Sequence, residues 1–314
     1  MANENSSLIA ARQAKKDEFY TQLSDIEKEL YHYKDHFKDK VVFCNCDDPV
    51  SSNFWRFFSK RFHLYGLKKL ISTHYEPSGD RSYKMEYTGK EIDGNLIWVQ
   101  KDLEGNGDFR SPECIEILKE ADIVVTNPPF SLFREYVAQL MAHGKKFIVI
   151  GNQNAITYKE IFPLLRDNKM WLGYHCGDMA FAVPPHYEER STRFWIDEQG
   201  QKWRSMGNIC WFTNLDIKKR HEDLPLYAHY SPEVYPQYDD YDAIEVSKVA
   251  AIPCDYYGVM GVPITFMNKY NPGQFEILGD SRYHDGQTVA DDINVINGKT
   301  LFRRILIRRK QNGN

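Results

Sequence analysis

Residues 122–130 read Asp-Ile-Val-Val-Thr-Asn-Pro-Pro-Phe, and this stretch decides the fold. Residues 123–126 are apolar or β-branched, which predicts a short buried strand. The two prolines cannot continue that strand, because each lacks an N–H and restricts the residue before it to extended geometry. Asn127 therefore stands where a buried strand ends. Asn-Pro-Pro is also a common turn, so its place after the strand is what gives it meaning.

Helix and strand patterns alternate on both sides of this strand. Ser24 begins a capping box before a predicted helix, Ser111 precedes a proline at another helix start, and Ser131 is placed to cap a third. The other predicted elements are strands 41–46, 67–75 and 146–150, a helix at 53–62 and a hairpin at 82–100. Such alternation is typical of a mostly parallel α/β sheet, in which ligands bind beyond the carboxyl ends of the strands. Asn127 lies at such an end.

The pattern changes beyond residue 190, where strands are separated by long polar connections. The predicted strands are 193–197, 207–215, 262–267, 275–278 and 300–308. We predict a flexible tail at 1–16, a catalytic domain at 17–215 and a C-terminal recognition region at 216–314. The boundary is open by tens of residues, and strands of the last region could return to the catalytic sheet.

Composition predicts a globular, cytoplasmic protein. The chain has 314 residues, 42% of them apolar, and no apolar run as long as the roughly 18 residues of a membrane span. Its six cysteines contain no C-x-x-C pair, so we expect neither a metal nor a disulfide framework. The net charge of −4 does not favour nucleic acid, although basic clusters occur at 218–221 and 303–310. We expect a monomer.

The chemistry of residues 127–130 suits a planar amino group. The Asn127 side-chain oxygen can accept one N–H of an exocyclic amine, and the Pro128 carbonyl can accept the other. Phe130 offers a face on which a ring can stack. The string resembles the (D/N)PP(Y/F) signature of S-adenosylmethionine-dependent amino-methyltransferases. That resemblance implies catalytic roles for Asn127, Pro128, Pro129 and Phe130.

Three further segments fit a site for the methyl donor. Phe19 and Tyr20 resemble an element that packs over the cofactor, although both are also ordinary core residues. Residues 45–49, Asn-Cys-Asp-Asp-Pro, take the place of the first cofactor motif without its usual glycines, and either acid could instead cap the next helix. The third segment, Gly107-Asp108-Phe109, resembles a motif whose Asp accepts a hydrogen bond from the cofactor, although it would also be an ordinary turn. The residues expected to bind the cofactor are Phe19, Tyr20, Asn45, Asp47, Asp48, Asp108 and Phe109.

Taken together, these segments resemble the EcoRI family of adenine-specific DNA methyltransferases. Residues 17–22, 41–49, 127–131, 252–266 and 270–279 carry the resemblance, which extends from about 15 to 310. It implies a Rossmann-like class I methyltransferase sheet and a mixed C-terminal DNA-recognition region. It also implies site-specific methylation of N6 of a flipped-out adenine in double-stranded DNA, with S-adenosylmethionine as donor, as in restriction-modification. An RNA or protein-amide amino-methyltransferase and an inactive DNA-binding homologue remain as alternatives.

Overall fold

The computed structural model describes residues 19–76, 81–239, 241–281, 283–284, 287–288 and 295–311. The chain forms two compact units. The first unit comprises Met1–Ala155 and Gly173–Leu215, and the second comprises Ile156–Leu172 and Asp216–Asn314. The tail predicted at 1–16 lies outside the described residues.

The first unit is built on a ten-stranded sheet, counted over the described residues. Its order is β1-β8-β10-β7-β6-β2-β3-β4-β5, with β9 paired to β10. The strands are β1 (Tyr20–Thr21), β2 (Val41–Cys44), β3 (Lys69–His74), β4 (Tyr83–Ile92), β5 (Asn95–Asp102), β6 (Ile123–Thr126), β7 (Lys146–Asn152), β8 (Trp171–Val183), β9 (Phe194–Ile196) and β10 (Lys202–Thr213). The central strands β3, β2, β6 and β7 are parallel, and both margins are antiparallel. The predicted α/β architecture is confirmed, but the sheet is mixed rather than mostly parallel, because antiparallel strands are added on both sides of the parallel centre.

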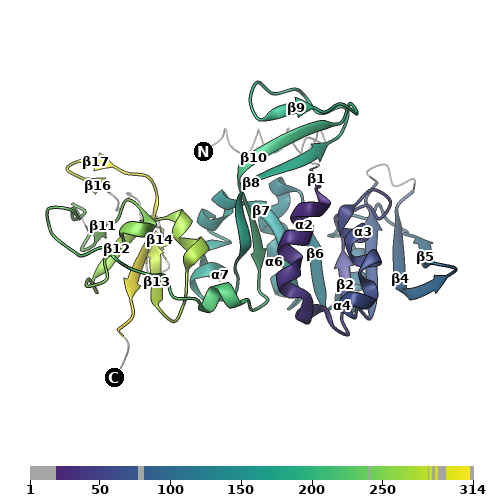
Figure 1. Cartoon of the computed structure of the whole chain (residues 1–314), viewed down its shortest axis with the longest axis horizontal. Coiled ribbons are helices and arrows are strands. Elements are labelled where there is room, and N and C mark those ends of the chain that lie inside the picture. Colours follow the sequence, from purple (N-terminus) through teal and green to yellow (C-terminus); the bar gives the residue numbers. More distant parts are fainter. Residues whose placement is uncertain are drawn as a thin grey trace. The chain divides into compact units, whose positions relative to one another are not determined.

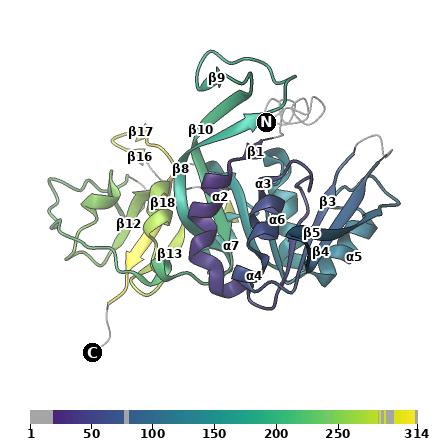
Figure 2. The same cartoon turned by 45° about the vertical axis from the view of Figure 1, so that its right-hand side comes forward.

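Helices cover this sheet (Figures 1 and 2). They are α2 (Leu23–Leu30), α3 (Asn53–Lys60), α4 (Phe62–Tyr65), α5 (Pro112–Glu120) and α6 (Phe133–Ala142), with 3₁₀ turns η1 (Tyr31–Phe37) and η2 (Phe130–Leu132). α3 buries Phe54, Phe57 and Phe58, and the Ser52 hydroxyl caps it by accepting from the Phe54 N–H at 3.0 Å. The predicted Ser111 cap of α5 is confirmed, because its hydroxyl accepts from Cys114 N.

Four local predictions were wrong or incomplete. The first helix begins at Leu23, so Ser24 lies inside it and Gln22 is the N-cap. Ser131 does not cap α6, because the chain leaving Pro129 first makes the tight turn η2. The strand predicted at 262–267 is half strand, since 264–269 forms a 3₁₀ helix. The thirteen-residue strand β8 was not predicted, because Gly173 and Gly177 interrupt its apolar alternation.

The second unit has a sheet of its own. Its order is β11-β12-β18-β13-β14-β15, and β16 pairs with β17 in a separate hairpin. The strands are β11 (Ile244–Glu245), β12 (Val259–Pro263), β13 (Phe275–Asp280), β14 (Tyr283–His284), β15 (Gln287–Thr288), β16 (Val295–Ile296), β17 (Lys299–Thr300) and β18 (Arg304–Arg309), with helices α7 (Phe162–Arg166), η4 (Lys218–His221), η5 (Val249–Ala251) and η6 (Ile264–Lys269). Over the described residues, none of the helices has the length and apolar character needed to cross a bilayer.

Candidate active site

A pocket of about 320 Å³ opens where β2, β3 and β6 end in the first unit. This volume falls in the range of small-molecule sites, about 300–1,000 Å³. Six of the residues predicted from the sequence line it, namely Tyr20, Asn45, Asp48, Asp108, Phe109 and Pro129. The other five, Phe19, Asp47, Asn127, Pro128 and Phe130, are not among its lining residues. The parallel strand ends therefore gather most of the predicted cofactor residues around one cavity.

The amide of Asn127 is held at its nitrogen. Nδ2 donates to the Phe19 carbonyl at 2.7 Å and to Thr21 Oγ1 at 3.2 Å. A carbonyl can only accept, so these partners fix which way the amide lies. Oδ1 is buried and has no hydrogen-bond partner among the residues that the structure describes. Leaving a buried acceptor unpaired costs about 1–3 kcal/mol, so this oxygen is placed for a donor that a ligand brings.

Aromatic rings pack together around Phe130, three residues after Asn127. Phe130 stacks on Phe19 with 5.4 Å between ring centroids and 23° between ring planes. Phe181 on β8 meets Phe130 edge-on at 6.2 Å. Phe19 and Tyr20 were predicted to pack over the cofactor. Phe19 instead stacks on Phe130, whereas Tyr20 lines the pocket. Together the rings make an apolar wall beside an unpaired acceptor.

Asp47 ties the catalytic strand end to the first cofactor segment. Its carboxylate accepts hydrogen bonds from the Thr126 hydroxyl, from Ser52 Oγ at 3.0 Å and from the Asn127 N–H. Desolvation of the carboxyl raises its pKa to about 7, although these three donors oppose that rise. Asp47 thus fixes the backbone from which the Asn127 amide projects.

Asp48 and Asn45 present polar atoms to the pocket. Asp48 accepts from the Tyr83 hydroxyl and from Val50 N, both at 3.0 Å, and its side chain is about one-third exposed. Asn45 is buried, and its side-chain oxygen accepts from the Tyr136 hydroxyl. The sequence left open that Asp47 or Asp48 caps the next helix, but the N-cap of α3 is Ser52. Asp48 is therefore the acid of this pair that can reach a cationic group in the pocket.

Asp108 and Phe109 lie on another wall of the same pocket. Asp108 Oδ1 accepts from Arg110 Nε at 2.8 Å and from Arg110 N at 2.9 Å. The Arg110 guanidinium also lies 5.2 Å from the centre of the buried Phe109 ring. These contacts fix the direction of the Asp108 carboxylate at the turn where Gly107 adopts a φ of 77°.

The sequence prediction missed several lining residues. His74 ends β3, and Tyr75 and Glu76 follow it directly. The rule that ligands bind beyond strand ends would have found them, because 67–75 was already predicted as a strand. Cys46, Ser51, Arg110, Ser131 and Leu132, together with Gly107 at the Asp108 turn, complete the lining.

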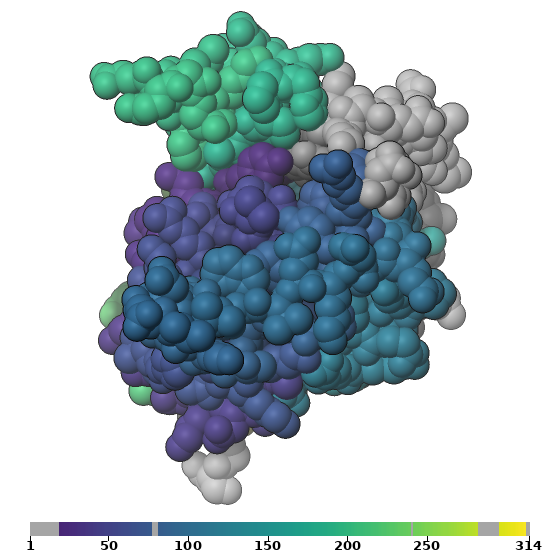
Figure 3. Space-filling view, turned by 90° about the vertical axis from the view of Figure 1, so that its right-hand side faces the viewer, coloured from purple at the N-terminus to yellow at the C-terminus, as the bar shows by residue number. Residues whose placement is uncertain are grey.

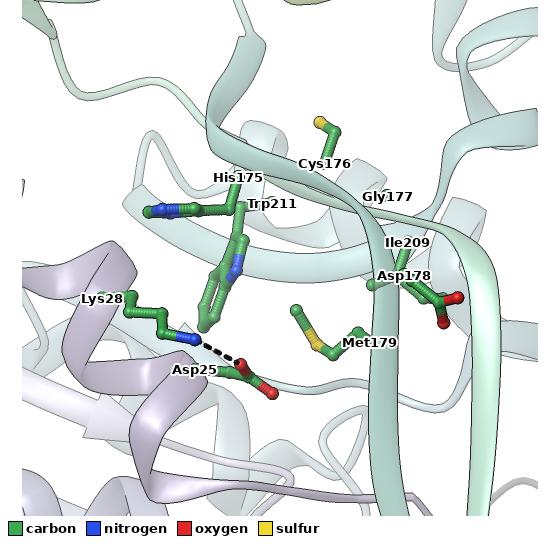
Figure 4. A pocket seen from close by; sticks show the side chains of 9 residues that line it. All are labelled: Asp25, Lys28, His175, Cys176, Gly177, Asp178, Met179, Ile209 and Trp211. Carbon is green, nitrogen blue, oxygen red and sulfur yellow. Dashed lines mark ion pairs between the residues drawn. The ribbon is translucent and has the colours of Figure 1, made fainter.

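A second, smaller cavity of about 150 Å³ lies between α2, β8 and β10 (Figure 4). Asp25 and Lys28 form a 3.9 Å ion pair on one side, and His175 and Met179 lie on β8. The buried Trp211 indole N–H lacks a hydrogen-bond partner within the described parts of the chain. The volume is half that of the pocket at the strand ends and lies below the usual range for ligand sites, about 300–1,000 Å³.

The second unit contains one group of potential metal ligands among its described residues. Atoms of His229, Cys254 and Asp255 lie within 4.8 Å of one another. Structural zinc normally takes four ligands, whereas this group offers three, two of them on exposed residues. His229 and Asp255 already pair at 2.9 Å, and that ion pair is sufficient to explain the grouping.

Known proteins match this chain along nearly its whole length. The family described as adenine-specific methyltransferase EcoRI matches residues 7–310. The chain belongs to this family. It is 48% identical over 323 residues to the Type II methyltransferase M.EcoRI of Escherichia coli. The alignment covers 98% of this chain and 97% of that protein. It is 41% identical over 324 residues to the Type II methyltransferase M.MpnI of Mycoplasma pneumoniae, with coverage of 96% and 98%.

A third member of the family extends the comparison. The Type II methyltransferase M.MgeORF184P of Mycoplasma genitalium is 38% identical over 317 residues, with coverage of 96% of this chain and 98% of that protein. No solved structure matches the chain significantly. The resemblance inferred from the sequence motifs is confirmed.

Proposed function

We propose that this EcoRI-family enzyme transfers the methyl group of S-adenosylmethionine to N6 of an adenine that is flipped out of duplex DNA. The Asn127 side-chain oxygen holds the amine that accepts the methyl group. Methylation of adenine in DNA follows from membership of the family. The identity of the donor, the flipped base and the residue roles are the proposed part. The observation that carries them is the buried, unpaired Asn127 Oδ1 beside an aromatic wall.

The proposed chemistry begins with a weak nucleophile. The lone pair of an adenine amine is delocalised into the ring, so the nitrogen is flat and unreactive. Asn127 Oδ1 accepts one N–H and the Pro128 carbonyl accepts the other, which draws the nitrogen toward tetrahedral geometry. Asn127 acts by electrostatic stabilisation rather than as a base, because an amide does not take up a proton at neutral pH. As the N–C bond forms, the bond between the donor sulfur and its methyl group would break and leave a neutral thioether, and the surplus proton then leaves to water.

The pocket at the strand ends fits S-adenosylmethionine. When bound, this donor supplies a sulfonium methyl group that an amine can attack in line. Asp48 would hold the cationic amino group, and Asp108 would accept from the adenine amine beside Phe109. Tyr20 and Asn45 line the same cavity. Positioning of donor and acceptor in one site supplies much of the acceleration expected of such an enzyme.

We assign the first unit to the Rossmann-like class I methyltransferases and the second to DNA recognition. Parallel strands β3, β2, β6 and β7 with antiparallel β10 support the first assignment. Arg308 and Arg309 on β18 and the basic turn η4 support the second, because phosphate contacts dominate affinity for DNA. Both assignments predict that the residues of the first unit within 17–215 hold the chemistry.

The Phe130 ring should matter more for turnover than for DNA binding. We expect Phe130→Ala to lower kcat by about 10- to 100-fold, because stacking of a base on an aromatic side chain is worth about 1–3 kcal/mol. Phe130→Tyr keeps the ring and should stay within about threefold of the wild type. Single-turnover methyl transfer and fluorescence anisotropy on the same duplex separate the two effects. A loss of DNA affinity in proportion to rate would show that Phe130 is structural.

Plasmid methylation tests the proposed function directly. Cells that express the enzyme should contain N6-methyladenine within one short sequence of the plasmid, as read by sequencing that detects modified bases. Purified enzyme should transfer tritium from methyl-labelled S-adenosylmethionine to that DNA. Transfer to RNA or protein in place of DNA would overturn the choice of substrate. Binding of DNA without any transfer would favour an inactive homologue.

A further inference from the structure

An arm, residues 184–208, extends from the sheet of the first unit, and within it β10 lies between β9 and the outer end of β8. β7 pairs with residues 209–213 of β10, and residues 202–208 continue beyond that pairing. At about 3.3 Å per residue, this extension is roughly 23 Å long. β9 pairs antiparallel with Lys202, Trp203 and Arg204. Figures 1 and 3 show the arm projecting from the body of the unit, with β9 in its outer part.

The arm is continuous with the proposed base site. The Phe19 ring, stacked on Phe130, lies 6.1 Å from the Tyr187 ring. Tyr187 in turn lies nearly parallel to Phe194 on β9, at 6.4 Å and 13°. Neighbouring rings thus lead from the catalytic loop to the arm without leaving the first unit. A duplex that delivers a flipped adenine to Asn127 would pass directly beside this path.

The outer part of the arm exposes large apolar side chains. Trp195 is 42% exposed and Ile196 is 49% exposed. Trp195 stacks on Trp203, its direct cross-strand partner, at 6.1 Å and 9°. Arg190 is exposed in the loop before β9. Exposed aromatic groups on a projecting element are typical of a surface that a partner covers.

The dimensions of the arm favour one partner. The major groove of B-DNA is about 12 Å wide and accepts two adjacent β-strands, such as the β9–β10 hairpin at the edge of the arm. The arm carries four basic and four acidic residues, so charge alone would not hold it to phosphates. The basic residues are Arg190, Arg193, Lys202 and Arg204, and the acidic residues are Glu188, Glu189, Asp197 and Glu198. Contact with base edges fits this composition better than phosphate binding does.

We propose that the arm enters the major groove next to the flipped adenine, where Trp195 contacts base edges and Arg190 contacts the backbone. The inference rests on the proposed function, because the flipped adenine brings the duplex to the arm. It adds a recognition surface on the first unit to the one assigned to the second.

Two variants test the arm in the full-length enzyme. We expect Trp195→Ala to raise the Kd for a labelled duplex carrying the methylated site about 10-fold or more, and to reduce discrimination against a duplex with one changed base pair. Trp195→Phe should restore most of the affinity. Arg190→Ala should weaken binding to both duplexes alike and lower the slope of log Kd against log salt by about 1. Arg56→Ala, on the exposed face of α3, is the matched control.

The outcomes separate the arm from the proposed function. If Trp195→Ala unfolds, which circular dichroism would show, Arg190→Ala still decides, because that side chain is exposed. Unchanged affinity and unchanged salt dependence in the folded variants would overturn the arm's role, even if the wild type methylates adenine in the duplex. Reduced affinity in both variants, with no methyl transfer by the wild type, would support the arm and overturn the proposed function.

Discussion

Replacement of Asn127 by Ala is expected to reduce methyl transfer by roughly 10³-fold, which corresponds to about 4 kcal/mol of transition-state stabilisation. The variant removes Oδ1, the buried acceptor that has no partner among the described residues. It also removes Nδ2, which donates to the Phe19 carbonyl, but Phe19 still stacks on Phe130. The measurement is single-turnover transfer of tritium to a duplex that carries the target site.

Binding of the cofactor should survive this substitution. Asn127 is not among the residues that line the 320 Å³ pocket, so the Kd for S-adenosylmethionine should stay within about threefold by titration calorimetry. Asn95→Ala, on an exposed strand residue, is the matched control and should leave both quantities unchanged. A transfer rate near that of the wild type in Asn127→Ala would remove Asn127 from the mechanism.

Asn127→Asp distinguishes an electrostatic acceptor from a base. The carboxylate keeps the oxygen that faces the amine, but it places a second oxygen against the Phe19 carbonyl, 2.7 Å from the present Nδ2. That contact changes from a hydrogen bond to a repulsion between two acceptors. We therefore expect activity between those of the wild type and the alanine variant. A rate that exceeds the wild type and rises with pH would instead indicate proton abstraction.

Strand ends were the part of this site that the sequence predicted well. Short apolar runs followed by polar residues placed Asn45, Asp108 and Pro129 around one pocket, because strands that run in the same direction end at the same edge. Direct contacts within the edge were not predictable. Whether Asp47 or Asp48 faces the pocket depends on the turn after β2, and the Ser52 cap and the Thr126 hydroxyl decide it.

The long antiparallel strand β8 could not be predicted from the sequence pattern either. β8 carries Gly173, which packs closely against Glu29, and polar residues that alternate poorly, so nothing in it signals a thirteen-residue strand. Tertiary pairing with β1 and β10 produces it. The arm extends from β10, which lies beside β8. Because β8 was not predicted from local patterns, the arm was not predicted either.

Asp47→Asn should lower kcat about 100-fold while the Kd for S-adenosylmethionine changes little, because misplacement of a reacting group by about 1 Å costs this much. The wild-type carboxylate accepts from Thr126, Ser52 and the Asn127 N–H. The amide oxygen can still accept from the Asn127 N–H, but this bond is weaker than one to a carboxylate, and the amide nitrogen must donate to a hydroxyl that now donates to Asp47. We therefore expect the Asn127 loop to shift. Thr126→Val removes one of the same bonds and should lower kcat in the same direction by a smaller factor.

The acidity of Asp47 gives this prediction a pH dependence that a purely structural residue would not show. Burial raises its pKa from 3.8 to about 7, so the folded state favours the protonated form. The contribution of Asp47 to stability is therefore greatest below pH 4 and is lost as pH rises from about 4 to about 7. Activity should run the opposite way, increasing through pH 7 as the carboxylate ionises and accepts all three donors. Asp47→Asn should lose this limb of the kcat profile and be at least as stable as the wild type at pH 8. An unchanged pH profile in the variant would mean that Asp47 does not position Asn127.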